Sequence, residues 1–151
     1  DLECPATGRV LNGGFDSGLA GWKAAAGPGE VVLDQGNNVL HLEMQANCAG
    51  FDAVLGLVSV PLLTTVPHPA IQFRYRGTGD RALRMLMPDQ TTWTEFQSSA
   101  VYKTARMCVP ASFEGTVPWL SIRPNSTGSC TTTQTDYWLD DLVVVNDPTC
   151  P

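Results

Sequence analysis

The sequence predicts an all-β protein, folded as an antiparallel sandwich of two sheets. Three observations favour this class. Apolar side chains recur in short runs of strand length, and in several runs they alternate with polar ones. Turn-forming residues, among them many of the 14 glycines and 11 prolines in 151 residues, separate the runs. No segment keeps a helical period over three turns, so we expect no long helix.

The runs of strand length follow one another along the whole chain. They are 30–34, 39–45, 54–62, 70–76, 82–87, 92–97, 106–109, 117–123 and 137–145. The turn-rich sequences between them are Gly-Asn-Asn at 36–38, Pro-His-Pro at 67–69, Gly-Thr-Gly-Asp at 77–80, Pro-Asp-Gln at 88–90 and Asn-Ser-Thr-Gly-Ser at 125–129. A spacing of roughly 8 to 12 residues between turn signals is typical of an antiparallel sandwich.

Alternation along a strand predicts which side chains share a face. In the run 70–76, apolar and polar side chains alternate. In the run that ends at Arg123, Leu120 and Ile122 alternate with Trp119 and Arg123. We therefore expect a solvent-exposed sheet face that carries a large aromatic ring.

Composition limits the classes of partner. A chain of this length can enclose one core, so residues 1–151 are expected to form a single domain. Nine Lys and Arg stand against fifteen Asp and Glu, a formal net charge of −6. Because nucleic-acid binding depends on clustered cations, neither DNA nor RNA is an expected partner. The longest apolar stretch, 54–66, is interrupted by glycine, proline, serine and threonine, so no membrane span is expected.

Five scattered cysteines indicate disulfides rather than a zinc site, because none belongs to a CxxC or Cys/His cluster. Disulfides in turn indicate a secreted or extracellular protein. Chain ends often lie close together, so the first expected bridge is Cys4–Cys150. A second candidate is Cys108–Cys130, which leaves Cys48 as the odd cysteine; other pairings stay open.

Two terminal signatures carry a family resemblance. An Asn-Gly-Gly-Phe sequence at 12–15 is followed by Gly-Trp at 21–22, and Leu-Asp-Asp-Leu stands at 139–142. Together with Phe-Arg-Tyr-Arg at 73–76 and Trp93, they make the chain resemble the jelly-roll carbohydrate-binding modules of the galactose-binding-like superfamily that accompany cellulases and xylanases. The resemblance implies a secreted, noncatalytic jelly-roll domain that binds a polysaccharide or oligosaccharide. Other domains of a larger secreted protein are further candidate partners.

The paired aspartates suggest a cation. Asp140 and Asp141 are adjacent in an apolar strand, so they cannot both face water if neighbours alternate, and a buried unpaired carboxylate is costly. The resemblance implies a structural calcium held by Asp140 and by the carbonyl oxygens of Gly14 and Asn38. Calcium accepts such oxygen ligands. The alternative is that Asp140 caps a turn by hydrogen bonds, without a metal.

Sugar recognition requires aromatic rings for the faces of a pyranose and planar polar groups for its rim. By resemblance, the concave sheet face would supply these groups from Trp93, Arg84, Gln90, Trp119 and Arg123, with Phe51 from the loop after the third strand. Trp119 and Arg123 replace positions that usually hold glutamine-like groups in the family. The glycan therefore stays open.

Other interpretations of the same side chains compete with these. Phe15 and Trp22 are expected in the core, and Trp138 is expected to pack in the core near His41. Neither histidine, His41 or His68, fits a recognisable nucleophile or metal pattern.

Two further functions stay open. The domain could be a structural or adhesive extracellular sandwich without a sugar groove, strengthened by calcium and disulfides. Arg84 and Arg123 could equally form surface ion pairs with Glu43 or Glu95. The domain could also be a small glycosidase that uses Glu43 and Glu95 as its two carboxylates.

Overall fold

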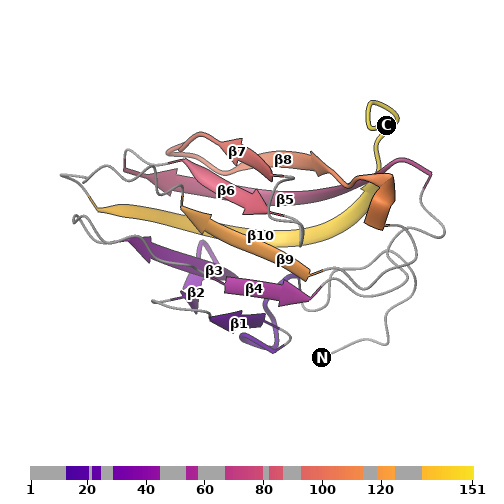
Figure 1. Ribbon diagram of the computed structural model, residues 1–151. Helices are drawn as coiled ribbons and strands as arrows, with labels where there is room; N and C mark the ends of the chain where they lie inside the picture. The colour runs from indigo at the N-terminus through magenta and orange to yellow at the C-terminus, as the bar shows by residue number, and fades with distance from the viewer. Residues whose placement is uncertain are drawn as a thin grey trace.

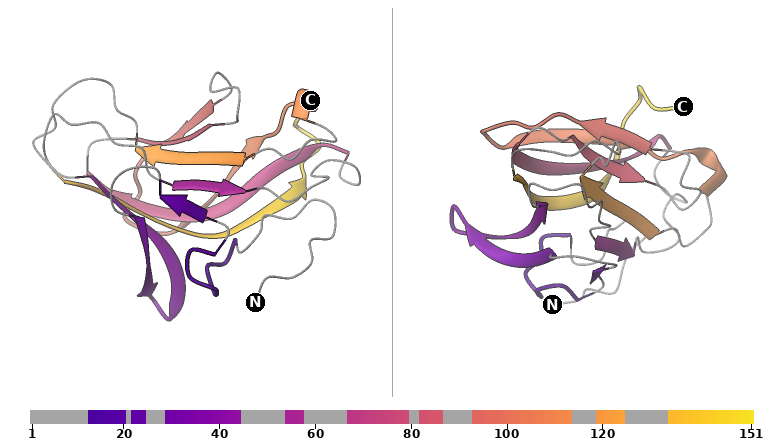
Figure 2. Two further views of the ribbon diagram at one scale, coloured as in Figure 1. Left: turned by 60° about the horizontal axis from the view of Figure 1, so that its bottom comes forward. Right: turned by 60° about the vertical axis from the view of Figure 1, so that its left-hand side comes forward.

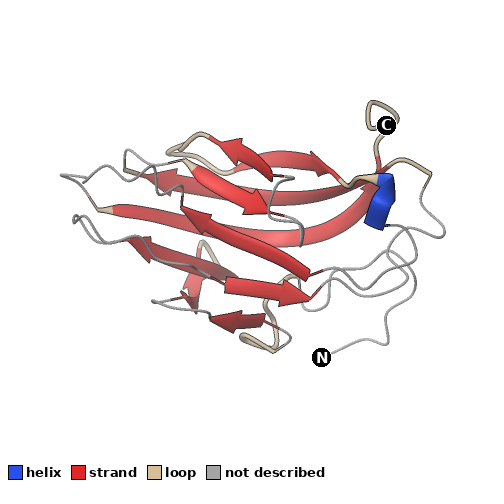
Figure 3. Ribbon diagram, viewed as in Figure 1, coloured by secondary structure: helices blue, strands red, loops and turns tan. Residues whose placement is uncertain are grey.

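The computed structural model describes residues 13–20, 22–24, 29–44, 54–57, 67–79, 82–86, 93–113, 119–124 and 134–151. Ten strands and a short 3-10 helix, η1, account for most of this part of the chain (Figures 1 and 3). They are β1 (Trp22–Ala24), β2 (Gly29–Asp34), β3 (Asn37–Met44), β4 (Val54–Leu57), β5 (Pro69–Thr78), β6 (Leu83–Leu86), β7 (Trp93–Phe96), β8 (Lys103–Cys108), η1 (Ala111–Phe113), β9 (Trp119–Pro124) and β10 (Thr135–Asn146). In these ranges no helix has the length and hydropathy to cross a membrane.

The strands form two five-stranded sheets. Sheet I has the order β1-β4-β9-β6-β7, and sheet II has the order β2-β3-β10-β5-β8. Every strand pair in both sheets is antiparallel. The two sheets form separate layers in Figure 2, where the β2–β3 hairpin projects from the rest of sheet II. The predicted antiparallel two-sheet sandwich is therefore confirmed.

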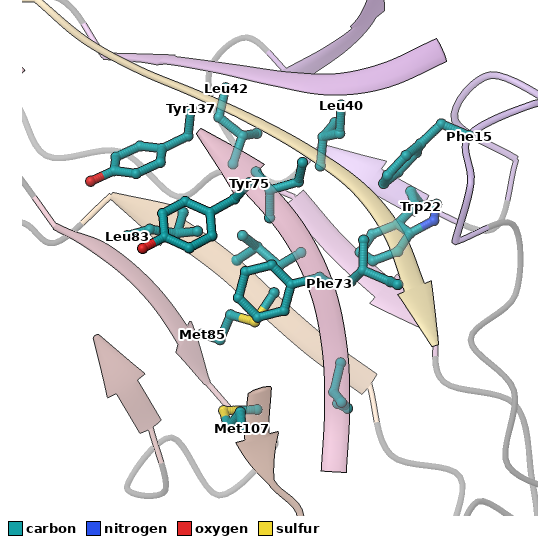
Figure 4. Close-up of a cluster of buried hydrophobic side chains, with 14 of the residues drawn as sticks. Phe15, Trp22, Leu40, Leu42, Phe73, Tyr75, Leu83, Met85, Met107 and Tyr137 are labelled. Carbon is teal, nitrogen blue, oxygen red and sulfur yellow. The ribbon is translucent and has the colours of Figure 1, made fainter. Parts of the chain in front are cut away.

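Alternate side chains of both sheets fill the space between the layers (Figure 4). In β5 the residues Ile71, Phe73 and Tyr75 are buried, while the residues between them are only partly buried. The buried cluster also contains Phe15, Trp22, Leu40, Leu42, Leu83, Met85, Met107, Val109, Ile122, Tyr137, Leu139 and Leu142. Burial of that much apolar surface is the main favourable term for folding. The prediction that Phe15 and Trp22 belong to the core is confirmed, and their rings lie 5.4 Å apart.

The hairpin between β2 and β3 turns one residue earlier than the sequence predicts. Gln35 and Gly36 both have positive φ, at 48° and 85°. Two successive left-handed residues suit the tight two-residue turn of an antiparallel hairpin. Asn37 and Asn38, predicted to lie in the turn, instead begin β3 and pair with β2.

Strand β10 bulges in its second half. Its register with β5 shifts between Asp140 and Val143, and Asp141 has a φ of 55°. The extra residue lets the adjacent residues Leu139 and Asp140 both be buried, while Asp141 is exposed and Leu142 is buried again. Strict alternation from Tyr137 and Leu139 would bury Asp141, so the bulge decides that Asp140 is the buried aspartate.

The disulfide joins Cys108 to Cys150, with 5.5 Å between their Cα atoms. Both predicted bridges, Cys4–Cys150 and Cys108–Cys130, are therefore wrong, because each uses one of these two cysteines with a different partner. The sheet order explains the pairing: β5 lies between β8 and β10, and its first residues pair with Cys108 on one side and with Asn146 on the other. The segment after β10 needs only a short turn to reach Cys108. Cys4, Cys48 and Cys130 lie outside the described residues.

Candidate functional site

The outer face of sheet I is the first candidate surface. Leu83, Met85 and Ile122 are fully buried between the sheets. Because side chains alternate along a strand, Arg84 and position 123 belong to the opposite, outer face. The register agrees, since Arg84 pairs with Arg123 on β9 and with Glu95 on β7.

Positions 93 and 119 share this face. Trp93 pairs with Leu86, which is two residues after Arg84 on β6. Trp119 pairs with Leu57 and lies four residues before Arg123 on β9. Strand spacing puts the two tryptophan positions two strands apart, about 10 Å across the sheet. The predicted sugar-binding positions on β6, β7 and β9 thus lie on the same side of the same sheet.

Most of the predicted sugar-binding side chains lie outside the described part of the chain. The side chains of Trp93, Trp119 and Arg123 lie outside what the structure describes, as do Gln90 and Phe51 as whole residues. Their role in sugar binding therefore stays a prediction.

Arg84 is described in full and forms an ion pair. Its Nη2 donates to Glu95 Oε1 at 2.8 Å, and the two side chains are 24% and 27% exposed. The predicted pairing with Glu95 is confirmed, whereas Glu43 is on the other sheet. Such a pair contributes little stability, but it holds a planar guanidinium at a fixed place on the outer face.

A second candidate site surrounds Asp140. Its side chain is buried, with 5% of the residue exposed, and Oδ1 accepts a hydrogen bond from the backbone N–H of Asp141 at 2.8 Å. Burial raises the pKa of Asp140 to about 6, and the nearby carboxylates of Asp141 and Asp16 add to the rise. A carboxylate in this position is costly to ionise unless a cation is bound.

The opening turn of the chain meets Asp140 at the bulge. The backbone N–H of Leu142 donates to Gly13 O at 3.1 Å. Asp16 follows two residues after Gly14, and its Oδ1 accepts from Asn38 Nδ2 at 3.5 Å. The three predicted calcium ligand residues therefore come from segments that the fold brings to one place.

The donors in this place fit a hard cation. They are carboxylate and backbone carbonyl oxygens, ligand types that calcium takes. Asp140, Gly14 and Asn38 would hold the ion, and Asp16 adds a carboxylate that the sequence-based prediction missed. The sequence signal for Asp16 is its place at the end of the Asn-Gly-Gly-Phe-Asp sequence at 12–16. Calcium itself stays a proposal.

Sheet II has an aromatic group on its outer face. Trp138 is half-buried and lies between His41 of β3 and Arg76 of β5, which are its cross-strand neighbours. The His41 and Trp138 rings are stacked at 5.0 Å, and the Arg76 guanidinium carbon lies 3.6 Å from the indole centroid. The expected contact with His41 is confirmed. The expected place in the core is wrong, because Tyr137 and Leu139 take the core-facing positions of this strand.

Arg76 is fixed by Asp34 at the end of β2. Arg76 Nε and Tyr102 Oη both donate to Asp34 Oδ2, at 3.1 Å and 2.6 Å. These hydrogen bonds lower the pKa of Asp34, while burial raises the pKa of Tyr102 to about 12. With both ring faces of Trp138 next to other side chains, this tryptophan is a poor platform for a sugar.

Comparison with known proteins identifies the fold. No protein-family model and no curated protein matches the sequence. Among solved structures, a family 11 carbohydrate-binding module from Clostridium thermocellum, in complex with a β-1,3-1,4-mixed-linked tetrasaccharide, superposes with a TM-score of 0.63 at 9% identity, over 94% of this chain and 98% of the other. The fold is that of a jelly-roll carbohydrate-binding module.

Two further carbohydrate-binding module structures agree. TmCBM61 in complex with β-1,4-galactotriose gives a TM-score of 0.56 at 13% identity, over 90% of this chain and 96% of the other. A family 22 module together with the catalytic module of a Clostridium thermocellum xylanase, complexed with xylohexaose, gives 0.61 at 12% identity, over 94% of this chain and 29% of the other. The jelly-roll module fold thus occurs both alone and as part of a longer enzyme chain, and the resemblance seen in the terminal motifs is confirmed for the fold.

The module fold also tests the glycosidase hypothesis. Glu43 lies on the outer face of sheet II, because its neighbour Leu42 is buried, whereas Glu95 pairs with Arg84 on the outer face of sheet I. The two carboxylates therefore face away from each other on opposite sides of the sandwich. They cannot flank one glycosidic bond, which requires carboxyl groups within about 10 Å of each other.

Proposed function

We propose that this chain is a noncatalytic carbohydrate-binding module that recognises a polysaccharide or oligosaccharide on the outer face of sheet I. The observation that carries the proposal is the shared face of positions 84, 93, 119 and 123 on three adjoining strands. Two tryptophans and two arginines supply both kinds of group that a sugar requires, namely flat apolar rings and planar hydrogen-bond donors. Arg84 is already oriented by Glu95.

The position of the two tryptophans favours an extended ligand. Residues 93 and 119 lie on different strands with β6 between them, about 10 Å apart across the sheet. A single pyranose is too small to contact both rings. We therefore propose that the ligand is a chain of sugars that crosses the sheet, with Gln90 and Phe51 contributing from its margin.

The proposal includes a structural calcium at Asp140, Gly14 and Asn38. The buried Asp140 carboxylate and the contact between Leu142 and Gly13 support it, because an ion there would fasten the opening turn to β10. The disulfide supports secretion. The xylanase structure supports a place beside other domains, since the chain corresponds to 29% of that protein.

Affinity electrophoresis tests the sugar site. The wild-type protein is run through gels that contain mixed-linkage β-glucan, β-1,4-galactan or xylan, and we expect retarded migration in at least one. Trp93→Ala and Trp119→Ala should each weaken that retardation at least about tenfold, because each removes a stacking ring. Trp138→Ala is the matched control: it removes the same side chain from the outer face of sheet II, and retardation should persist.

Two results would overturn the proposal. If the folded wild-type protein migrates freely in every gel, the domain is a structural or adhesive sandwich. If Trp138→Ala abolishes retardation while Trp93→Ala and Trp119→Ala do not, sugar binds to sheet II. Circular dichroism of each variant separates loss of binding from loss of fold.

A further inference from the structure

Three side chains with metal-binding atoms meet on the outer face of sheet II. His41 and Glu43 are two residues apart on β3, and Asp136 lies opposite them on β10. His41 Nε2 is 2.8 Å from Asp136 Oδ1. One ligand atom from each of the three residues lies within 4.8 Å of the other two. All three residues are partly buried, so the group faces solvent from a defined position on the sheet.

The strand register places two negative charges directly opposite each other. Glu43 and Asp136 are cross-strand partners in the β3–β10 pair. Like charges at such positions destabilise a sheet. A cation between the carboxylates removes this cost, and the imidazole nitrogen of His41 is placed to share in binding it.

The His41 ring is held in the orientation of a metal ligand. Its Nδ1 lies 3.5 Å from Glu30 Oε1, so the two ring nitrogens face carboxylates on opposite sides. Trp138 stacks on the ring at 5.0 Å with an interplanar angle of 10°. A histidine ligand commonly donates its second N–H to a carboxylate, which fixes the tautomer and leaves the other nitrogen free to coordinate.

Asp136 is also positioned by a neighbour. Gln134 Nε2 donates to both carboxylate oxygens of Asp136, at 3.2 Å and 3.0 Å. The carboxylate is thus oriented from one side while Oδ1 points to His41. His41 and Asp136 are therefore each oriented by neighbouring side chains, as the ligands of metal sites commonly are.

We propose that His41, Glu43 and Asp136 form a binding site for a divalent transition-metal ion of the zinc class. One imidazole nitrogen with two carboxylates suits zinc better than calcium, which takes oxygen ligands alone. A tetrahedral zinc site requires about 3.4 Å between ligand atoms, and the three ligand atoms already lie within 4.8 Å of one another. Water would complete the coordination.

This site is distinct from the proposed calcium site. Asp136 lies four residues before Asp140 on β10, about 13 Å along the strand. The ion would join β3 to β10 in sheet II, on the opposite side of the sandwich from the proposed sugar site. Zinc binding and sugar binding can therefore succeed or fail independently.

Isothermal titration with zinc tests the site. The protein is tag-free, its disulfide is intact, any free thiol is alkylated, and calcium is present in excess so that the Asp140 site does not take up zinc. We expect one zinc ion per chain. His41→Gln and the isosteric Glu43→Gln should each weaken binding at least about tenfold, and Glu30→Gln should weaken it to a smaller extent by releasing the ring.

His68→Gln is the matched control, because it removes the other histidine of the chain, which directly precedes β5 and accepts a hydrogen bond from Asp147 at the opposite end of β10 from the Asp136 site, and zinc binding should be unchanged. Wild-type protein that binds no zinc overturns the proposal. So does equal zinc binding by wild type, His41→Gln and Glu43→Gln. Circular dichroism checks the fold of each variant, and Glu43→Gln keeps the size of the side chain if His41→Gln does not fold.

Discussion

At the scale of single residues, Gly77 shows how the core depends on an absent side chain. Gly77 of β5 pairs with Tyr137 of β10, whose ring is fully buried. A Cβ atom at position 77 would lie 2.4 Å from the Cε1 atom of that ring. Since the ring is packed on all sides, it has no room to move away.

Gly77→Ala is therefore expected to reduce the free energy of unfolding by about 1–3 kcal/mol, the usual cost of overpacking a core. Urea denaturation measures the change. In a Tyr137→Leu background the same substitution should cost much less, because the clashing ring is gone. An equal cost in both backgrounds would show that the contact with Tyr137 is not the cause.

Asp140, Asp16 and His41 show which features of the two candidate metal sites can be predicted from the sequence and which cannot. Alternation within one strand sufficed to predict that one of the two adjacent aspartates is buried, and Asp140 is. It could not reveal Asp16, because the electrostatic interaction of Asp16 with Asp140 is between the turn at 13–20 and β10, which are far apart in the sequence. For the same reason no local sequence pattern marks His41: its carboxylate neighbour on β10, Asp136, is 95 residues away in the sequence.

At the scale of elements, the Cys108–Cys150 disulfide holds the edge strand β8 of sheet II to the segment after β10. Strand β8 ends sheet II and pairs only with β5 among the described strands. The bond from Cys108 to Cys150 ties the end of β8 to the segment after β10, across a sequence separation of 42 residues. A cross-link over a loop of that length restricts the unfolded chain.

We expect the double substitution Cys108→Ser with Cys150→Ser to reduce the free energy of unfolding by about 4 kcal/mol, from the chain-entropy estimate for such a loop. Guanidinium unfolding under non-reducing conditions measures it. Wild-type protein treated with a reductant is the control and should shift in the same direction. An unchanged midpoint in the double variant would mean that the bridge does not form in solution.

Element positions were easier to predict than element partners. Runs such as 70–76 and 117–123 became β5 and β9 because alternation is a local property. Strands β8 and β10 begin earlier than the predicted runs 106–109 and 137–145. Their first residues are polar, and apolar patterns do not identify polar residues as strand. The bridge was mispredicted because the pairing depends on β5 lying between β8 and β10, and sheet order is a non-local property.

At the scale of the whole molecule, the sandwich gives each strand an inner and an outer face. Successive side chains alternate between the two faces, so a residue's position along the strand decides whether it is buried between the sheets or faces outward. That rule predicted the shared side of positions 119 and 123 on one strand, whereas Arg84 and position 93 were placed with them by the family resemblance, and the strand register gives all four positions the same parity. It also explains why the two outer faces have different chemistry. Sheet I presents the positions of the proposed sugar site, and sheet II presents His41 and its carboxylates.

The buried carboxylate of Asp140 should make the free energy of unfolding depend on both pH and calcium. The pKa of Asp140 is about 6 in the folded protein and its ordinary value is 3.8. Between these values the folded state binds more protons than the unfolded state, so without metal this group makes stability fall as pH rises. The loss is complete above the folded pKa, and a bound calcium ion would reverse it by favouring the ionised form.

In chelator, wild type should therefore lose about 2 kcal/mol of unfolding free energy relative to Asp140→Asn between pH 4 and pH 7. Adding calcium at pH 7, at about 100 times its dissociation constant, should restore about 2.7 kcal/mol to wild type and nothing to Asp140→Asn. Thermal and urea unfolding over a pH series measure both effects. Asp141→Asn makes the same change at the exposed neighbour; it should keep the calcium response and most of the pH dependence, because burial is the main cause of the raised Asp140 pKa and the Asp141 charge adds less. Equal stabilisation of Asp140→Asn by calcium would mean that the ion binds elsewhere, and parallel pH curves for wild type and Asp140→Asn would mean that the carboxylate is not buried in solution.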